Sequence, residues 1–227
     1  TAIANVTPAG MLAEQHKNNP KNDIIGALLN GKGKEAGLSD EEFVWFFLML
    51  IAAGNESTRT VTSHGMRLLM EHPDQLQYLV DHPERIPDAC EEILRYNTAF
   101  ILMRRTAMED VELAGHRIGK GDKIILHYHT VNHDERIFGD DAMDFDVRRA
   151  ERMPDLYNQH RSFGIGQHFC LGTHLARLEL RVILEEVIPR LRNPRLAGEI
   201  RYTRSSLVNG IKSMPITFDP EVKRVAA

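Results

Sequence analysis

One short stretch of the sequence combines glycines with a single cysteine in a way that suits metal ligation. It covers residues 162–172 and reads Ser-Phe-Gly-Ile-Gly-Gln-His-Phe-Cys-Leu-Gly. Gly164 and Gly166 allow the backbone to approach a flat or bulky group closely. Cys170 stands where a loop meets the start of a predicted helix, and the backbone N–H groups and helix dipole there lower the pKa of a thiol. Gly172 leaves the space beside the sulfur free, so this loop is suited to present a thiolate.

A lone thiolate has a narrower chemistry than a cysteine cluster. The only other cysteine is Cys90, and no Cys or His stands at the spacing of a closed zinc site. A single thiolate can be the axial ligand of a haem iron, where it donates electron density that promotes O–O cleavage. The alternative is that Cys170 is a buried, unreactive cysteine at a helix start.

A second unusual stretch, residues 53–58, lies in the longest apolar segment and reads Ala-Gly-Asn-Glu-Ser-Thr. Gly costs about 1 kcal/mol relative to Ala inside a helix, and a buried acid costs more unless it is paired. The hydroxyls of Ser57 and Thr58 can bond to the carbonyl four residues earlier and bend the helix. With Glu56 they would open a groove for water or O2. The alternative is that Glu56 only pairs with Arg59.

These stretches have to be positioned by a mainly helical α+β chain with small sheets. Ser39 and Glu42 have the spacing of a capping box at the start of a long helix. That helix is apolar on nearly all sides over residues 43–53, which predicts a central position with Trp45, Phe46 and Phe47 in the core. The predicted helices cover about residues 8–30 with a break at Pro20, 40–70, a segment from Pro73, a segment after Pro83 to Tyr96, and 173–187. The predicted strands are 101–103, 111–113, 116–118 and 124–128, followed by an irregular stretch over 132–162 and a final hairpin around Asn209-Gly210.

Composition excludes several classes of protein. Hydrophobic residues make up 42% of the 227 residues, enough to bury a core, so a disordered chain is excluded. The net charge of −4 and the lack of a long Lys/Arg block speak against a nucleic-acid partner. The longest apolar run, Phe43 to Ala53, is too short to span a membrane, which takes about 20 residues. With no signal-peptide pattern and two cysteines far apart, we expect a cytoplasmic protein.

The cysteine stretch resembles the ligand loop of the cytochrome P-450 family, Phe-x-x-Gly-x-x-x-Cys-x-Gly. Phe163, Gly166, Cys170 and Gly172 match every fixed position. The resemblance implies that Cys170 is the metal ligand, the axial thiolate of haem b, and that His168 hydrogen-bonds a haem propionate. It also implies that Phe163 packs over the thiolate and that Gly164 and Gly172 border the cofactor.

Two further motifs carry the resemblance to catalysis and haem binding. The family's central helix has Ala/Gly-Gly-x-Asp/Glu-Thr, whose acid and alcohol deliver protons to iron-bound dioxygen. Aligned on Gly54, Glu56 is the acid, Ser57 stands where the family usually has Thr, and Thr58 is the alternative alcohol. Arg105, before Thr-Ala, matches an arginine that binds a propionate. For Arg105 the alternative is a solvated arginine on an edge strand.

The fourth motif is Glu-x-x-Arg, which by itself is common in helices. In the family it is a structural ion pair behind the haem, so the resemblance assigns Glu92 and Arg95 to it. Its third member is an arginine in the segment that here reads Phe145-Asp-Val-Arg, so we assign Arg148, with Arg149 as the neighbouring candidate.

The histidines carry weaker predictions. His127 and His129 would share a face of a strand and could be half of a metal site, although core or edge histidines are favoured. The remaining histidines considered are expected at the surface or at helix boundaries. They are His16, His64, His72, His82 and His133.

The four motifs span residues 53–172 and occur in the family's order. We therefore expect residues 1–227 to be the C-terminal portion of one P-450 domain of a soluble bacterial member, with the N-terminal half of that fold absent from this chain. It would have a long distal helix, a proximal helix after the Cys loop and small sheets. The uncovered apolar surface would favour a dimer or a companion N-terminal half.

The resemblance implies a monooxygenase that uses O2 to hydroxylate an apolar small molecule of terpenoid, steroid or alkyl type. Electrons would come from a ferredoxin-type or other electron-transfer protein, because the chain has no flavin or nucleotide motif. One alternative is a peroxygenase that uses H2O2, against which the Glu56-Ser57 pair argues. The other is a truncated, catalytically incomplete fragment that binds haem.

Overall fold

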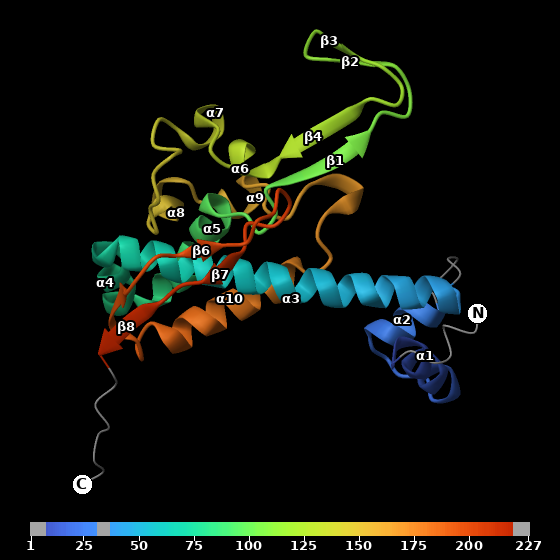
Figure 1. Ribbon diagram of the computed structural model, residues 1–227, viewed down its shortest axis with the longest axis horizontal. Coiled ribbons are helices and arrows are strands. Elements are labelled where there is room, and N and C mark those ends of the chain that lie inside the picture. The colour runs from blue at the N-terminus through green and yellow to red at the C-terminus, as the bar shows by residue number, and fades with distance from the viewer. Residues whose placement is uncertain (1–7, 31–36, 220–227) are drawn as a thin grey trace. The chain divides into compact units, whose positions relative to one another are not determined.

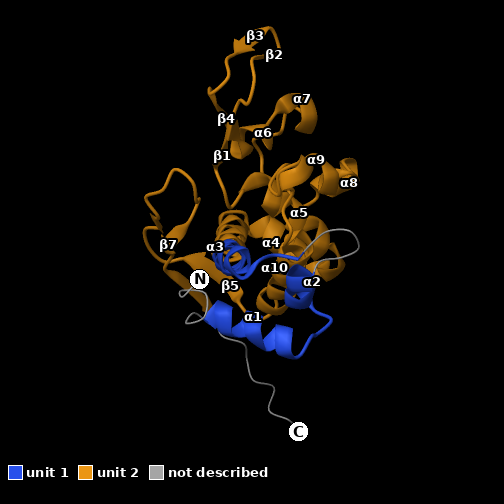
Figure 2. Ribbon diagram, turned by 90° about the vertical axis from the view of Figure 1, so that its right-hand side faces the viewer, with its two compact units in different colours: residues 1–55 blue, residues 56–227 orange. Residues whose placement is uncertain are grey.

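The structure is a computed structural model that describes residues 8–30 and 37–219. The chain divides into two compact units, residues 1–55 and residues 56–227 (Figure 2). The boundary lies inside the long helix α3, Asp40–Glu71. Each unit has a cluster of buried apolar side chains of its own.

In the smaller unit, α1 (Pro8–Asn18) and α2 (Ile24–Asn30) occupy the range predicted as a helix with a break at Pro20. His16, predicted at the surface or at a helix boundary, lies in the last turn of α1 but is not at the surface. It is 3% exposed, because Nδ1 bonds to the Leu12 carbonyl and Nε2 lies 3.0 Å from the Asp23 carboxylate. These two contacts satisfy both ring nitrogens, so the ring can be buried.

The start of α3 confirms the predicted capping box. The Ser39 hydroxyl donates to the Glu42 carboxylate at 2.7 Å, and the same carboxylate accepts the Ser39 backbone N–H at 2.9 Å. These two hydrogen bonds, the side-chain one being the stronger influence, lower the pKa of Glu42. The first turn of α3 is therefore closed by its own side chains.

The apolar segment of α3 is only partly covered within the described residues. Phe43 and Val44 are buried, and Val44 packs with Ala9 of α1. Trp45, in contrast, is 67% exposed, so its predicted place in the core is wrong for the chain as described. Large apolar side chains farther along this helix are also exposed, namely Leu48, Met49 and Ile51.

The larger unit is held together by helices. α4 (Pro73–Asp81), the 3-10 turn η1 (Pro83–Arg85), α5 (Ile86–Tyr96) and α10 (Thr173–Val187) follow the predicted ranges. Proline occupies the first positions of α4 and η1, where its missing N–H costs no helical hydrogen bond. The proline pattern therefore correctly divided this region into helices.

The core of the larger unit is formed by α3, α4, α5 and α10 (Figure 1). Its fully buried side chains include Leu69, Leu79, Ile93 and Leu184. Gly65 lets α3 approach α5 closely, because a Cβ at that position would lie 3.0 Å from the Ile93 Cδ1 atom. α5 is thus the buried helix from which the polar groups described below extend.

The sheets are small antiparallel pairs, as predicted. β1 pairs with β4 and β2 with β3, and Figure 1 shows the β2–β3 tip extending from the β1–β4 ribbon. β6 pairs with β7 around the predicted Asn209-Gly210 turn, and β5 pairs with β8. The strands are β1 Leu102–Thr106, β2 Val111–Leu113, β3 His116–Ile118, β4 Lys123–His127, β5 Arg192–Leu196, β6 Arg201–Tyr202, β7 Ile211–Ser213 and β8 Ile216–Asp219.

The stretch between β4 and α10 is irregular, as predicted, apart from single-turn helices. β4 ends at His127, which caps the next helix by accepting the Thr130 backbone N–H at Nδ1. His127 and His129 therefore do not share a strand face, and that prediction is wrong. The single-turn helices are α6 Tyr128–Val131, α7 Glu135–Phe138, α8 Arg149–Arg152, α9 Leu156–Gln159 and the 3-10 turn η2 Gly166–His168.

Two more of these histidines are buried, and the predicted place at the surface or a helix boundary is wrong for His64, which lies inside α3. The Nε2 atom of His64 lies 2.7 Å from the Asn209 carbonyl, and burial lowers the pKa of this ring. His133 is 9% exposed and stacks edge-on against Tyr96.

Within residues 8–30 and 37–219, no helix has the length and apolar character needed to cross a membrane.

Candidate functional site: the cysteine loop and its support

The Cys170 loop has a defined backbone. The Cys170 N–H donates to the Phe163 carbonyl at 2.9 Å, which closes the loop, and the Phe169 N–H donates to the Gly166 carbonyl at 3.0 Å. Gly164 and Gly166 have φ values of 75° and 74°, which side chains rarely adopt. The two glycines are therefore required by the turn that brings Cys170 to the start of α10.

The surroundings of the cysteine are open on one side. A Cβ at Gly172 would lie 4.0 Å from the Cys170 Sγ atom, at ordinary van der Waals distance, so position 172 borders the sulfur. The thiol is half-buried, whereas Ile165, Phe169 and Leu171 around it are exposed. A thiol among exposed apolar side chains fits a large apolar cofactor better than a small ion.

The donor set also fits haem. Among the residues that the structure describes, no cluster of three or more His, Cys, Asp or Glu could hold a metal ion. The guanidinium of Arg105 bonds to the Arg104 carbonyl, and it has no ion-pair partner within the described part of the chain. An unpaired arginine on β1 and an exposed His168 at the end of η2 supply groups suited to carboxylates.

The other cysteine has the opposite environment. Cys90 lies on α5 and is 2% exposed. Burial, with a smaller contribution from the Glu91 carboxylate, raises the pKa of its thiol to about 12. The buried, unreactive environment that was the alternative for Cys170 is therefore the environment of Cys90.

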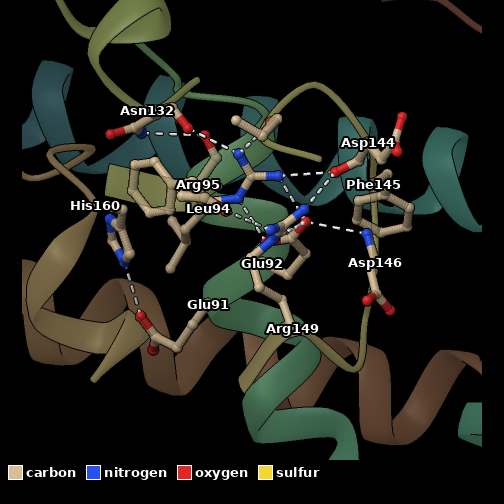
Figure 3. Close-up of polar contacts among 12 residues, drawn as sticks. Glu91, Glu92, Leu94, Arg95, Asn132, Asp144, Phe145, Asp146, Arg149 and His160 are labelled. Atoms are coloured by element: carbon tan, nitrogen blue, oxygen red, sulfur yellow. Dashed lines mark hydrogen bonds and ion pairs between the residues drawn. The ribbon is translucent and has the colours of Figure 1, made fainter. Parts of the chain in front are cut away.

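Behind the loop, Glu92 and Arg95 form a buried ion pair (Figure 3). The Arg95 Nε and Nη2 atoms donate to the two Glu92 carboxylate oxygens at 2.6 and 2.7 Å, and both side chains are 0% exposed. The remaining N–H groups of Arg95 donate to backbone carbonyls of the irregular stretch. Those carbonyls belong to Asn132, Ala142 and Asp144.

The third member of this network is Arg149, and the assignment of Arg148 is wrong. The Arg149 Nε atom lies 3.1 Å from the Glu92 carboxylate, and Arg149 also donates to the Phe138, Asp141 and Asp144 carbonyls. Arg148 is exposed and pairs with Glu151. Sequence spacing could not separate two adjacent arginines. The start of α8 decides the question, because it directs Arg149 towards α5 and Arg148 towards solvent.

Sequence reasoning missed Asn132, which ties this network to the loop. Asn132 is 0% exposed, and its amide donates to the Arg95 carbonyl and to the Ser162 hydroxyl. Its side-chain oxygen accepts the Arg161 N–H at 2.7 Å. Nothing in the sequence marked it except its position in a long irregular stretch, where a buried amide commonly satisfies backbone groups.

The predicted acid of the central helix is paired locally. Both Glu56 oxygens accept from the Arg59 Nη2 atom, at 2.7 and 2.6 Å. Glu56 also faces the β6–β7 hairpin, because a Cβ at Gly210 would lie 3.7 Å from its Oε1 atom. Within the described residues, the hydrogen bonds and the ion pair of Glu56 are made with Arg59 and not with the Cys170 loop. The roles predicted for Glu56, Ser57 and Thr58 therefore remain predictions.

Comparison with known proteins identifies the family. The model of the cytochrome P-450 family matches residues 86–194, which include the ion-pair network and the Cys170 loop. Linalool 8-monooxygenase of Pseudomonas putida is 37% identical over 92% of this chain and 50% of its own length. The chain belongs to the cytochrome P-450 family. Steroid C26-monooxygenase of Mycolicibacterium smegmatis is also 37% identical, over 91% of this chain and 50% of its own length.

The P-450 fold is shared as well. CYP109E1 of Bacillus megaterium, solved with testosterone, aligns with a TM-score of 0.83 and 33% identity, over 92% of this chain and 57% of that chain. The mainly helical P-450 fold with small sheets is therefore confirmed. The chain spans about half the length of the curated P-450 relatives it matches.

Proposed function

We propose that this chain is the C-terminal portion of a haem-thiolate monooxygenase that hydroxylates an apolar small molecule. The observation that carries the proposal is the half-buried Cys170 thiol at the start of α10, in a loop shaped by two left-handed glycines. Bound there, haem b would supply the activation of O2 that a protein side chain cannot provide. Cys170 would supply the thiolate that binds its iron, and Phe163, Gly164 and Gly172 would help to hold the cofactor.

Polar residues of this chain would orient the cofactor and move protons. Arg105 would bind one propionate as a planar guanidinium and His168 would hydrogen-bond another. The Glu56 carboxylate, held by Arg59, would take up protons from solvent and pass them on through the hydroxyl of Ser57 or Thr58. The Arg59 contact would have to open for each transfer, since it occupies both carboxylate oxygens.

The substrate class and electron source follow from the relatives and the sequence. The curated relatives described above act on linalool and on steroids, as their names state. We therefore assign a terpenoid, steroid or alkyl substrate. We assign the electron supply to a ferredoxin-type or other electron-transfer protein.

Exposed apolar side chains support the proposal that another folded part covers this chain. On α10, Leu175, Leu178 and Val182 stand three or four residues apart and are each at least 43% exposed. This spacing puts them on one face of a helix. We assign the cover to an N-terminal half, in keeping with relatives of about twice the length. A second copy of the chain is the alternative.

The ligand assignment is tested by the ferrous–CO difference spectrum of the chain after haem supplementation. We expect a red-shifted Soret band typical of a thiolate ligand, and its loss in Cys170→Ala. Cys90→Ala is the matched control and should keep the band, since Cys90 lies in the apolar core. An unchanged band in Cys170→Ala would refute the assignment.

Turnover assays distinguish a monooxygenase from a peroxygenase and from a fragment that only binds haem. A monooxygenase would convert a terpene or steroid with a ferredoxin system and O2, and Glu56→Ala would uncouple O2 reduction from hydroxylation. Equal turnover with H2O2 alone would favour a peroxygenase. A thiolate band without turnover in either assay would indicate a fragment that only binds haem.

A further inference from the structure

A second buried polar cluster begins at the residue of α5 that precedes Glu92. Glu91 is its centre. The Arg177 Nε and Nη2 atoms of α10 donate to the two Glu91 oxygens at 2.8 and 2.9 Å. The His160 Nε2 atom lies 2.9 Å from the Glu91 Oε2 atom, as Figure 3 shows. The Glu91 side chain is 14% exposed and His160 only 1%, so this arrangement is well shielded from water.

Arg177 is held in one orientation by more than its charge. Its guanidinium carbon lies 3.7 Å from the centre of the Tyr157 ring and 4.5 Å from that of Phe163. Its Nη1 atom also donates to the Thr173 hydroxyl at 2.5 Å. A planar guanidinium can stack on rings and bond bidentately at the same time, which a lysine ammonium cannot do.

These contacts reach both ends of the cysteine loop. Phe163, whose ring Arg177 covers, supplies the carbonyl that accepts the Cys170 N–H at 2.9 Å. Thr173, which Arg177 also bonds, is the first residue of α10 and stands three positions after the cysteine. Between these two points the loop residues 165–169 are exposed. Arg177 thus contacts the residues just before and just after an otherwise open loop.

We propose that Glu91 and Arg177 are positioning residues that fix the Cys170 backbone by clamping Phe163 and Thr173. The proposal rests on the proposed function in one respect, because it takes Cys170 as the residue whose position has to be fixed. Glu91 orients Arg177, and Arg177 holds the Phe163 carbonyl in line with the Cys170 N–H. The Glu92 network has a different task, because it bonds the carbonyls of the irregular stretch rather than the ends of the loop.

The test measures amide hydrogen exchange in the chain without added haem, residue by residue. In Arg177→Ala we expect the Cys170 amide to exchange at least tenfold faster, while the Leu184 amide of α10 keeps its rate. Glu91→Gln removes the charge with little change in shape and should give a smaller increase at the same amide. Arg177→Lys keeps the charge but loses the stacking on the rings. It should therefore not restore the exchange rate of the Cys170 amide to that of the unsubstituted chain.

Arg181→Ala is the matched control, because Arg181 stands one turn farther along α10 and pairs with Glu185 at the surface. It should leave the Cys170 amide within about twofold of the unchanged chain, as exposed ion pairs contribute little. The proposal would be overturned if the exchange rates of the Leu184 and Cys170 amides rose equally in both Arg177→Ala and Glu91→Gln, because this would show a general loss of stability. Full rescue by Arg177→Lys would overturn the role of stacking.

A second readout follows the haem-supplemented chain. In Arg177→Ala the fraction of the ferrous–CO band with thiolate character should fall, whereas in Arg181→Ala it should not. If the unchanged chain shows no thiolate band but the exchange result holds, the proposed function fails and the clamp stands. If the thiolate band is present and neither the exchange nor the band responds to Arg177→Ala, the clamp fails and the proposed function stands.

Discussion

The adjacent arginines Arg148 and Arg149 provide a sharp test of the buried network. Both have the same chemistry and stand side by side in the sequence, yet the Arg149 side chain is 1% exposed and that of Arg148 is 56% exposed. Replacing each with methionine removes the same charge and similar donors. We expect Arg149→Met to be severely destabilising and Arg148→Met to be nearly neutral.

The magnitude follows from what each change leaves behind. Arg149→Met would remove the guanidinium that donates to the Phe138 carbonyl, and it would remove one of the two cations at Glu92. Breaking a buried pair in this way costs about 3–5 kcal/mol. Arg148→Met removes an exposed contact with Glu151, and such exposed pairs contribute little to stability. Since whole proteins are stable by about 5–15 kcal/mol, the first change is a large fraction of the total.

Equilibrium urea unfolding followed by far-ultraviolet circular dichroism measures this difference. With m values of about 1–3 kcal/mol/M, the midpoint of Arg149→Met should fall by at least about 1 M relative to Arg148→Met. Arg149→Lys should lie between them, because it keeps a cation near Glu92 but loses the fork of donors. Equal midpoints for the two methionine variants would refute the placement of Arg149 in the network.

Three further predictions concern other parts of the chain. Ser39→Ala should destabilise the start of α3 by about 1 kcal/mol, seen as faster exchange of its first amides, and unchanged exchange would argue against the capping box. Burial lowers the pKa of His133 from 6.5 to about 4, so the folded chain keeps this ring neutral while the unfolded chain protonates it. The free energy of unfolding should therefore fall as the pH is lowered from 6.5 towards 4, and His133→Gln should flatten this dependence whereas a change at the exposed His82 should not. Iodoacetamide at neutral pH should label Cys170 but not Cys90, whose pKa burial raises to about 12, and peptide mass spectrometry showing the reverse order would contradict the two environments.

Local features of the sequence were sufficient for most secondary structure. The α10 range was predicted correctly from its apolar period and from Pro189 beyond it, and the strands β2 and β3 from period two between glycines. Proline at the start of α4 and the Ser39 capping box act within a few residues, so they can be recognised without knowledge of the fold.

Predictions that depended on burial were less successful. Trp45 was placed in the core because its neighbours are apolar, yet within the described residues it is 67% exposed. His64 was expected at the surface or a helix boundary, yet it is buried inside α3 with a partner on another segment. A histidine can be buried only when both ring nitrogens find suitable surroundings, and the sequence does not show which distant carbonyl or carboxylate will provide them.

The sequence by itself was sufficient to propose the candidate site. The loop ending in Cys170, with its glycines, and the Glu92–Arg95 spacing are local patterns whose chemistry is set by residue type and order. Tertiary structure decided which side chains support that site. Arg149 rather than Arg148 bonds Glu92, Asn132 joins the irregular stretch to the loop, and Arg177 reaches Glu91 across 86 positions. These contacts join segments far apart in the chain, and only the packing of α5 against α8 and α10 brings their polar atoms within hydrogen-bonding distance.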